Sequence, residues 1–157
     1  MRARPTRTIA ALAVGAAVSR LTAAPMPPIG PADITGTIAA LCWVDRHEEK
    51  ARIPGASGTL GVDRVIGAHY LVILHDVAGP DGKTLEALAA ALCVTVPGYL
   101  APPGQRGLSL QLNSDDPGLL RAGMRIRVIG YELGGDEGAV WTRYDKLEIL
   151  DAPAERD

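Results

Sequence analysis

The sequence predicts a mainly β protein: a small barrel of five to six strands with one or two short helices. Three observations support this fold class. Apolar residues alternate with polar or small ones in several segments, only one segment has a clear helical period, and Gly and Pro together account for 30 of 157 residues, so turns are frequent. The 47% hydrophobic and 22% charged residues are typical of one globular domain, which excludes a disordered, collagen-like or disulfide-dense chain.

The first 24 residues resemble a secretory signal. Arg2, Arg4 and Arg7 form a basic start, and residues 9–18 (IAALAVGAAV) form an apolar run of the length found in signal peptides. The run is too short for a transmembrane helix, which needs about 20 apolar residues. The segment therefore predicts export to the periplasm or the medium, with processing between Ala16 and Met26.

A retained N-terminal anchor, a transit peptide and a cytoplasmic location are the alternatives to export. Residues 25–32 (PMPPIGPA) are rich in proline, which stiffens a chain and removes backbone donors, so we expect a linker there. The expected organisation is a signal peptide or anchor at 1–24, the linker at 25–32, a single barrel domain at 33–150 and a charged tail at 151–157.

Strands are expected where the apolar pattern has a period of two. Residues 69–77 (HYLVILHDV) are the richest in β-forming side chains, and Met124, Ile126 and Val128 place alternate apolar residues on the core face of another strand. Residues 45–67 are polar and Gly-rich and are interpreted as a long loop. The expected strands are 34–44, 69–77, 108–112, 124–133 and 140–150.

One helix is expected at residues 84–92 (TLEALAAAL). Its residues favour helices, and Leu85, Leu88 and Leu92 fall on one face. A β-hairpin with an Ala-rich second strand is the competing interpretation of this segment. Residues 114–117 (SDDP) combine capping residues with a proline at a first-turn position, which predicts a second, brief helix.

The C-terminal residues 119–150 resemble the closing part of an OB-fold barrel. The resemblance depends on a short helix, then the spacing of Gly123, Arg125, Val128 and Gly130, then a turn and a last strand. The chain is similar in size and layout to small exported OB-like proteins of bacteria. The helix at 84–92 departs from that pattern, because it precedes the third strand instead of following it.

Cys42 and Cys93 are the only two cysteines of the chain. If the protein is exported, a disulfide between them closes a loop of about 50 residues and stabilises the fold by roughly 4 kcal/mol in the chain-entropy model. The alternative is two buried free thiols. No Cys-x-x-Cys motif is present, which argues against thiol redox catalysis.

Three residues have the spacing of a weak metal site. Asp45, His47 and Glu49 alternate, so they share one face of an extended chain, and their side chains are ligand types for a divalent cation. A solvated charged segment is the simpler interpretation. His69 and His75 share one face of their strand, and an acid-base or metal-dependent enzyme using His47, His69 or His75 is the alternative to a protein without catalysis.

No catalytic residue is assigned. Ser57 lies in Gly-Ala-Ser-Gly, which is not the nucleophile elbow of hydrolases, and the glycine clusters lack the spacing of phosphate loops. Asp115 and Asp116 are adjacent and are explained by turn chemistry. No cofactor is expected.

A ligand-binding face is expected on the last two strands. Arg125, Arg127 and Tyr131 fall opposite the apolar side of one strand, and Trp141 and Arg143 share a face of the next. Arginines beside aromatic rings bind single strands, glycans or peptides. The function expected is that of a non-enzymatic exported binding module for a protein, glycan or small ligand.

A single-stranded nucleic-acid binder is a further alternative. The charges argue against it, because residues 1–24 carry four arginines and no acidic residue, and the rest carries 12 basic and 18 acidic groups.

Overall fold

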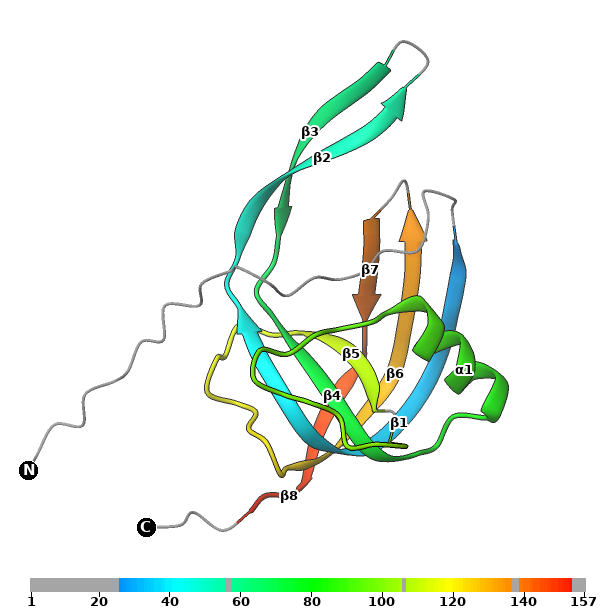
Figure 1. Ribbon diagram of the computed structural model, residues 1–157, viewed down its shortest axis with the longest axis vertical. Helices are drawn as coiled ribbons and strands as arrows, with labels where there is room; N and C mark the ends of the chain where they lie inside the picture. Colours follow the sequence, from blue (N-terminus) through cyan, green and yellow to red (C-terminus); the bar gives the residue numbers. More distant parts are fainter. Residues whose placement is uncertain (1–25, 56–57, 106, 137–138, 154–157) are drawn as a thin grey trace, which may run out of the picture.

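Strands make up most of the computed structural model, which describes residues 26–55, 58–105, 107–136 and 139–153 (Figure 1). The mainly β prediction is therefore confirmed, and one helix is present in the described part of the chain. The expected signal segment lies outside the described residues. The elements are β1 (Met26–Val44), β2 (His47–Gly55), β3 (Gly58–Ile66), β4 (His69–Ala78), α1 (Gly82–Ala91), β5 (Leu108–Asn113), β6 (Arg125–Asp136), β7 (Ala139–Arg143) and β8 (Lys146–Asp151).

The long strand β1 organises the main sheet. It pairs antiparallel with β6 from Met26 to Thr37 and with β4 from Thr35 to Val44. The order of the sheet is β5-β4-β1-β6-β7, and β8 pairs with the other half of β6. Ile34 and Ile38 on β1 are buried while their chain neighbours are half-buried or exposed, as the period of two predicts.

The linker predicted at residues 25–32 is wrong from Met26 onward, because these residues form the first part of β1. Proline cannot donate to a ladder and is tolerated in strands mainly at edges and bulges. The register between β1 and β6 shifts between Met26 and Ile29, again before Ala32 and again before Ile34. These irregularities accommodate Pro27, Pro28 and Pro31, which lie in this half of the strand.

The core lies along the main sheet and beneath α1, and β4 is buried on both of its faces, from His69 to Leu74. Ile126 and Val128 on β6 are buried, as is Met124 just before the strand, so the predicted core face is confirmed. Tyr70 and Tyr131 are the largest of the fully buried side chains. The remaining members include Ile34, Ile38, Val72, Leu74, Leu88, Leu92, Leu108, Leu110, Leu112 and Leu133.

The sheet is not closed into a barrel by backbone pairing, since no ladder joins β5 to β7 in the described residues. Side chains bridge this gap, which we call the seam. The Asn113 Nδ2 amide donates to the Thr142 carbonyl at 2.9 Å, and the Tyr144 hydroxyl donates to the Asn113 carbonyl. The buried Tyr131 hydroxyl accepts from the Gln111 N–H at 3.3 Å and lies 3.4 Å from the Gln111 carbonyl.

The segment 45–67 is not a loop but a second, two-stranded sheet of β2 and β3. This hairpin, called the arm below, projects away from the six-stranded sheet (Figure 1). Two pairs of opposite charge lie across its strands, Glu49 opposite Arg64 and Lys50 opposite Asp63. Cross-strand charge pairing therefore accounts for part of the polarity that favoured a loop.

The helix α1 confirms the prediction for 84–92 and excludes the competing hairpin. Asp81 is its N-cap and accepts from the Thr84 N–H at 2.7 Å. After α1 the chain crosses β5 and β4. The Val94 N–H donates to Ser109 Oγ on β5 at 3.3 Å, and the Tyr99 hydroxyl lies 2.9 Å from His75 Nε2 on β4.

The second helix predicted after residues 114–117 does not form, because this stretch is a series of turns. The Ser114 and Asp116 side chains accept from the Asp116 and Gly118 N–H groups, which stabilises turns in place of a helix. The buried Tyr70 hydroxyl accepts a hydrogen bond from the Leu119 N–H at 3.1 Å.

The single strand predicted at 140–150 is divided into β7 and β8. The break lies beside Gly130, whose φ is +70° and whose Cα has no room for a side chain next to the Asp145 carboxylate.

Candidate functional site

The structure removes one of the five residues from the predicted binding face. Gly130 has a left-handed backbone and interrupts the alternation of β6, so that Tyr131 turns into the core instead of continuing the exposed face. Tyr131 is fully buried and holds the seam. Its inclusion in the face was therefore wrong, and the outer face of β6 and β7 retains Arg125, Arg127, Trp141 and Arg143.

Carboxylates neutralise the arginine at one end of this face. Arg127 Nη2 lies 3.2 Å from Asp33 Oδ2, and Arg127 Nη1 lies 4.0 Å from Glu148 Oε2. Lys146 Nζ pairs with the other oxygen of Glu148 at 2.9 Å. Asp33 also accepts from the Gly130 N–H at 3.1 Å, so this cluster fixes the backbone of β6.

The other end of the face is also charge-balanced. The Arg143 guanidinium lies 5.5 Å from the centre of the Trp141 ring and donates from Nε to Glu132 Oε2 at 2.7 Å. The Trp141 ring packs closely on the backbone at Gly134. Because Arg127 and Arg143 are both paired with carboxylates, they offer little net attraction for phosphates, so these pairs give the nucleic-acid alternative no support.

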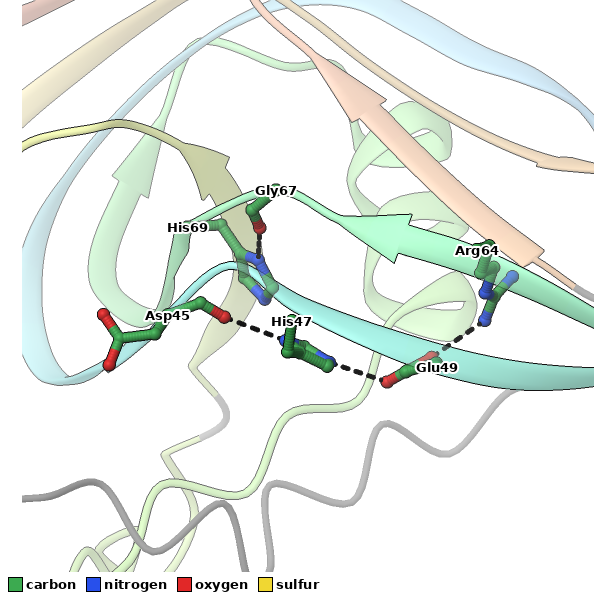
Figure 2. A network of polar contacts seen from close by, with 6 residues as sticks. All are labelled: Asp45, His47, Glu49, Arg64, Gly67 and His69. Atoms are coloured by element: carbon green, nitrogen blue, oxygen red, sulfur yellow. Dashed lines mark hydrogen bonds and ion pairs between the residues drawn. The ribbon is translucent and has the colours of Figure 1, made fainter.

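A second polar network lies at the root of the arm (Figure 2). His47 Nδ1 is 2.8 Å from the Asp45 carbonyl oxygen, and His47 Nε2 is 2.9 Å from Glu49 Oε1. Arg64 Nη2 on β3 donates to Glu49 Oε2 at 3.2 Å. The network therefore connects the end of β1 to both strands of the arm.

These contacts do not form the predicted metal site. No group of three His, Cys, Asp or Glu side chains is arranged to hold a metal ion in the described ranges. Both ring nitrogens of His47 already have oxygen partners, and the Asp45 carboxylate accepts from Trp43 Nε1 at 2.8 Å. The hydrogen bond to the Asp45 carbonyl, followed by the bond to Glu49, raises the pKa of His47 above its ordinary 6.5.

The other two histidines have different surroundings. His69 is only 5% exposed, and its Nδ1 lies 2.8 Å from the Gly67 carbonyl oxygen. Burial lowers the pKa of His69 below its ordinary 6.5. His75 lies six residues further along β4, roughly 20 Å away at strand rise, where it contacts Tyr99. The three histidines of the enzyme alternative are therefore not gathered at one site.

The expected disulfide is absent, because both cysteines are free. Cys42 lies on β1, is half-buried and is opposite Leu71 of β4, whereas Cys93 is exposed just after α1. Burial raises the pKa of the Cys42 thiol, which disfavours the reactive thiolate.

Sequence reasoning found Asp45, His47 and Glu49 at the root but missed the arm and its cross-strand partner Arg64. The signal in the sequence was two complementary charge pairs, Glu49 with Arg64 and Lys50 with Asp63, which become visible only when 47–50 and 63–66 are aligned antiparallel. It was overlooked because charged residues were counted as loop formers.

Comparison with known proteins identifies no relative: no protein-family model, curated protein or solved structure matches this chain. No helix in the described ranges is long and apolar enough to cross a membrane.

Proposed function

We propose that this protein is an exported, non-catalytic binding module on an OB-like barrel, and that the arm is its contact element for a protein partner. The observation that carries the proposal is the arm itself. Its two strands form a separate sheet that projects from the body. An isolated two-stranded hairpin is at best marginally stable in water, so such an extension is better explained by a contact role than by a contribution to the fold.

The strand connections support the OB-like barrel. If β7 and β8 are counted as one broken strand, the sheet has five strands in which the first pairs with the second and the fourth, as in β1 with β4 and β6. OB-folds are five-stranded, partly open barrels that bind ligands on the face of strands 2 and 3 and with the loops joining strands 1–2 and 4–5. The arm occupies the first of these loop positions, between β1 and β4.

The face of β4 and β5 is less available in this chain. The segment after α1 lies against it through Val94 on Ser109 and Tyr99 on His75. This coverage favours the arm over the sheet face as the place of contact. Small-molecule sites are usually concave, whereas a projecting ribbon is convex and fits a macromolecular surface. We therefore favour a protein over a small ligand.

Site-specific photo-crosslinking in the native host tests the contact role. A photoreactive benzoylphenylalanine replaces Val65 on β3, which is 52% exposed, or Leu100 on the body, which is 91% exposed and serves as the matched control. We expect protein adducts from position 65 and not from position 100. Adducts from position 100 alone, equal adducts from both positions, or none from position 65 would overturn the proposal.

Export is tested separately by the mass of the protein recovered from its host. The basic start and apolar run of residues 1–24 support processing between Ala16 and Met26. Recovery of the exported protein with its N-terminus intact would refute cleavage.

A further inference from the structure

The root of the arm carries a feature that the contact role alone does not require. Both nitrogens of the His47 ring face oxygen acceptors, the Asp45 carbonyl at 2.8 Å and the Glu49 carboxylate at 2.9 Å. A neutral imidazole has one N–H and can satisfy only one of them, whereas an imidazolium donates to both. The arrangement in Figure 2 is therefore complete only when His47 is protonated.

We propose that His47 is a proton-dependent latch that fixes the arm to the body of the protein. The proposal names the regulation of the contact element and rests on the proposed function. Protonated His47 joins the Asp45 carbonyl, just after β1, to Glu49 on β2, and Arg64 extends the connection to β3. Loss of the proton leaves one of the two ring nitrogens facing its oxygen partner, either the Asp45 carbonyl or the Glu49 carboxylate, as acceptor against acceptor, which breaks that contact and releases the root.

The body side of the latch is rigid. Trp43 Nε1 donates to the Asp45 carboxylate at 2.8 Å, and the Trp43 ring lies edge-on against Tyr70 with ring centres 4.8 Å apart. Tyr70 is 1% exposed and belongs to the core. The Asp45 carbonyl is therefore held in place, so a change at His47 acts on the arm and not on the core.

The charged and titratable groups around His47 define the range in which the latch is closed. Glu49 on β2 favours its protonation, and the Arg64 guanidinium on β3 is held by Glu49. His69 on β4 lies close enough for the two rings to interact electrostatically, and its burial favours the neutral form. Protonation of His47 is therefore favoured over protonation of His69.

The sign of the pH dependence follows from these directions. The pKa of His47 is raised, so the stabilisation of the root is fully present below 6.5 and is lost as the pH rises through the pKa of the folded protein. The pKa of His69 is lowered, so its contribution is present above 6.5 and is lost as the pH falls through that lower value. Between the lower pKa of His69 and the higher pKa of His47, His47 is protonated, His69 is neutral and the root is closed.

Hydrogen exchange of the full chain, followed by NMR, tests the latch. Protection factors divide out the intrinsic pH dependence of exchange, and the amides of residues 47–50 and 63–66 report on the root. We expect protection there to fall about tenfold above the pKa of His47, as for the loss of one charge-assisted hydrogen bond, while the β1–β4 ladder stays unchanged. The ring resonances of His47 locate the pKa in the same samples.

Three variants separate the latch from other titrations. His47→Gln should abolish the pH dependence of root protection. Glu49→Gln should keep the root protected at high pH, because its amide N–H donates to unprotonated Nε2. His75→Gln, far from the root, should behave like the wild type.

Protection that is independent of pH in the wild type, or a pH dependence that survives His47→Gln, would overturn the latch. Hydrogen exchange is measured on the isolated protein and needs no partner. The latch can therefore fail this test while crosslinking supports the contact role, and the contact role can fail while the latch is supported.

Discussion

The six-stranded sheet and the arm are both antiparallel β structure, but different interactions stabilise them. The sheet buries fully apolar side chains such as Ile126 and Leu74, both 0% exposed. At its root the arm has polar cross-strand pairs, such as Glu49 with Arg64, whose side chains are 38% and 21% exposed. Burial of apolar area contributes far more than exposed ion pairs, so the global stability resides in the sheet and the arm can be altered almost independently.

The largest difference in the free energy of unfolding is expected when an aspartate replaces an apolar residue in the sheet and in the arm. Ile126→Asp buries an unpaired carboxylate in the core and should cost several kcal/mol, comparable with the total stability of a small domain. Val65→Asp on the arm should change the free energy of unfolding by about 0.5 kcal/mol or less, because Val65 is 52% exposed. Thermal unfolding measures both. A stable Ile126→Asp variant would show that the register of β6 is wrong.

A smaller effect is expected at the seam. Tyr131→Phe removes the hydroxyl that serves the Gln111 backbone and leaves buried polar groups unpaired, at a cost of about 1–3 kcal/mol. Tyr144→Phe is the matched control at the more exposed end of the seam and should cost less. Urea unfolding of both variants gives the comparison, and equal costs would contradict the assignment of Tyr131 as the principal bridge.

The burial of His69 predicts a pH effect on global stability. Neutral His69 is preferred in the folded state, so stability should fall as the pH drops below 6.5, by at most about 1.4 kcal/mol per pH unit for one proton. His69→Asn keeps a donor for the Gly67 carbonyl without titrating. The difference between the wild type and this variant between pH 7 and 5 isolates the effect, and identical slopes would show that His69 does not contribute.

The smallest effect is expected on the outer face of β6. Arg127→Ala breaks exposed ion pairs with Asp33 and Glu148 and should cost less than about 1 kcal/mol. Chemical unfolding at low and high salt measures it, with the difference from the wild type shrinking as salt screens the pairs. If Arg127→Ala lowers the free energy of unfolding as much as Tyr131→Phe does, the ion pairs of this face contribute more to stability than exposed pairs should.

The sequence predicted the parts of the fold that depend on apolar periodicity. Residues 69–77 and the core positions Ile126 and Val128 agree with the structure because alternate burial leaves a direct pattern in the chain. The linker prediction for 25–32 and the loop prediction for 45–67 failed because proline and charged residues were given more weight than the pairing of strands. Pairing partners lie far apart in the sequence, and only their alignment shows that Glu49 and Arg64 are complementary.

The candidate site was less predictable than the fold. Strict alternation placed Tyr131 beside Arg127, but one left-handed glycine at position 130 reversed the side on which Tyr131 lies. A local break of this kind depends on tertiary contacts with Asp33 and Asp145, which the sequence does not reveal. His47 and Glu49 were recognised as a cluster, but their partner Arg64 came from the opposite strand.

The seam also bears on how the molecule avoids aggregation. An open sheet exposes the unpaired N–H and C=O groups of its edge strand, onto which a strand of another molecule can add. In the second half of β5 two residues already have such partners, the Gln111 backbone in the Tyr131 hydroxyl and the Asn113 carbonyl in the Tyr144 hydroxyl. Tyrosine hydroxyls therefore protect this edge against intermolecular strand addition without requiring the sheet to close.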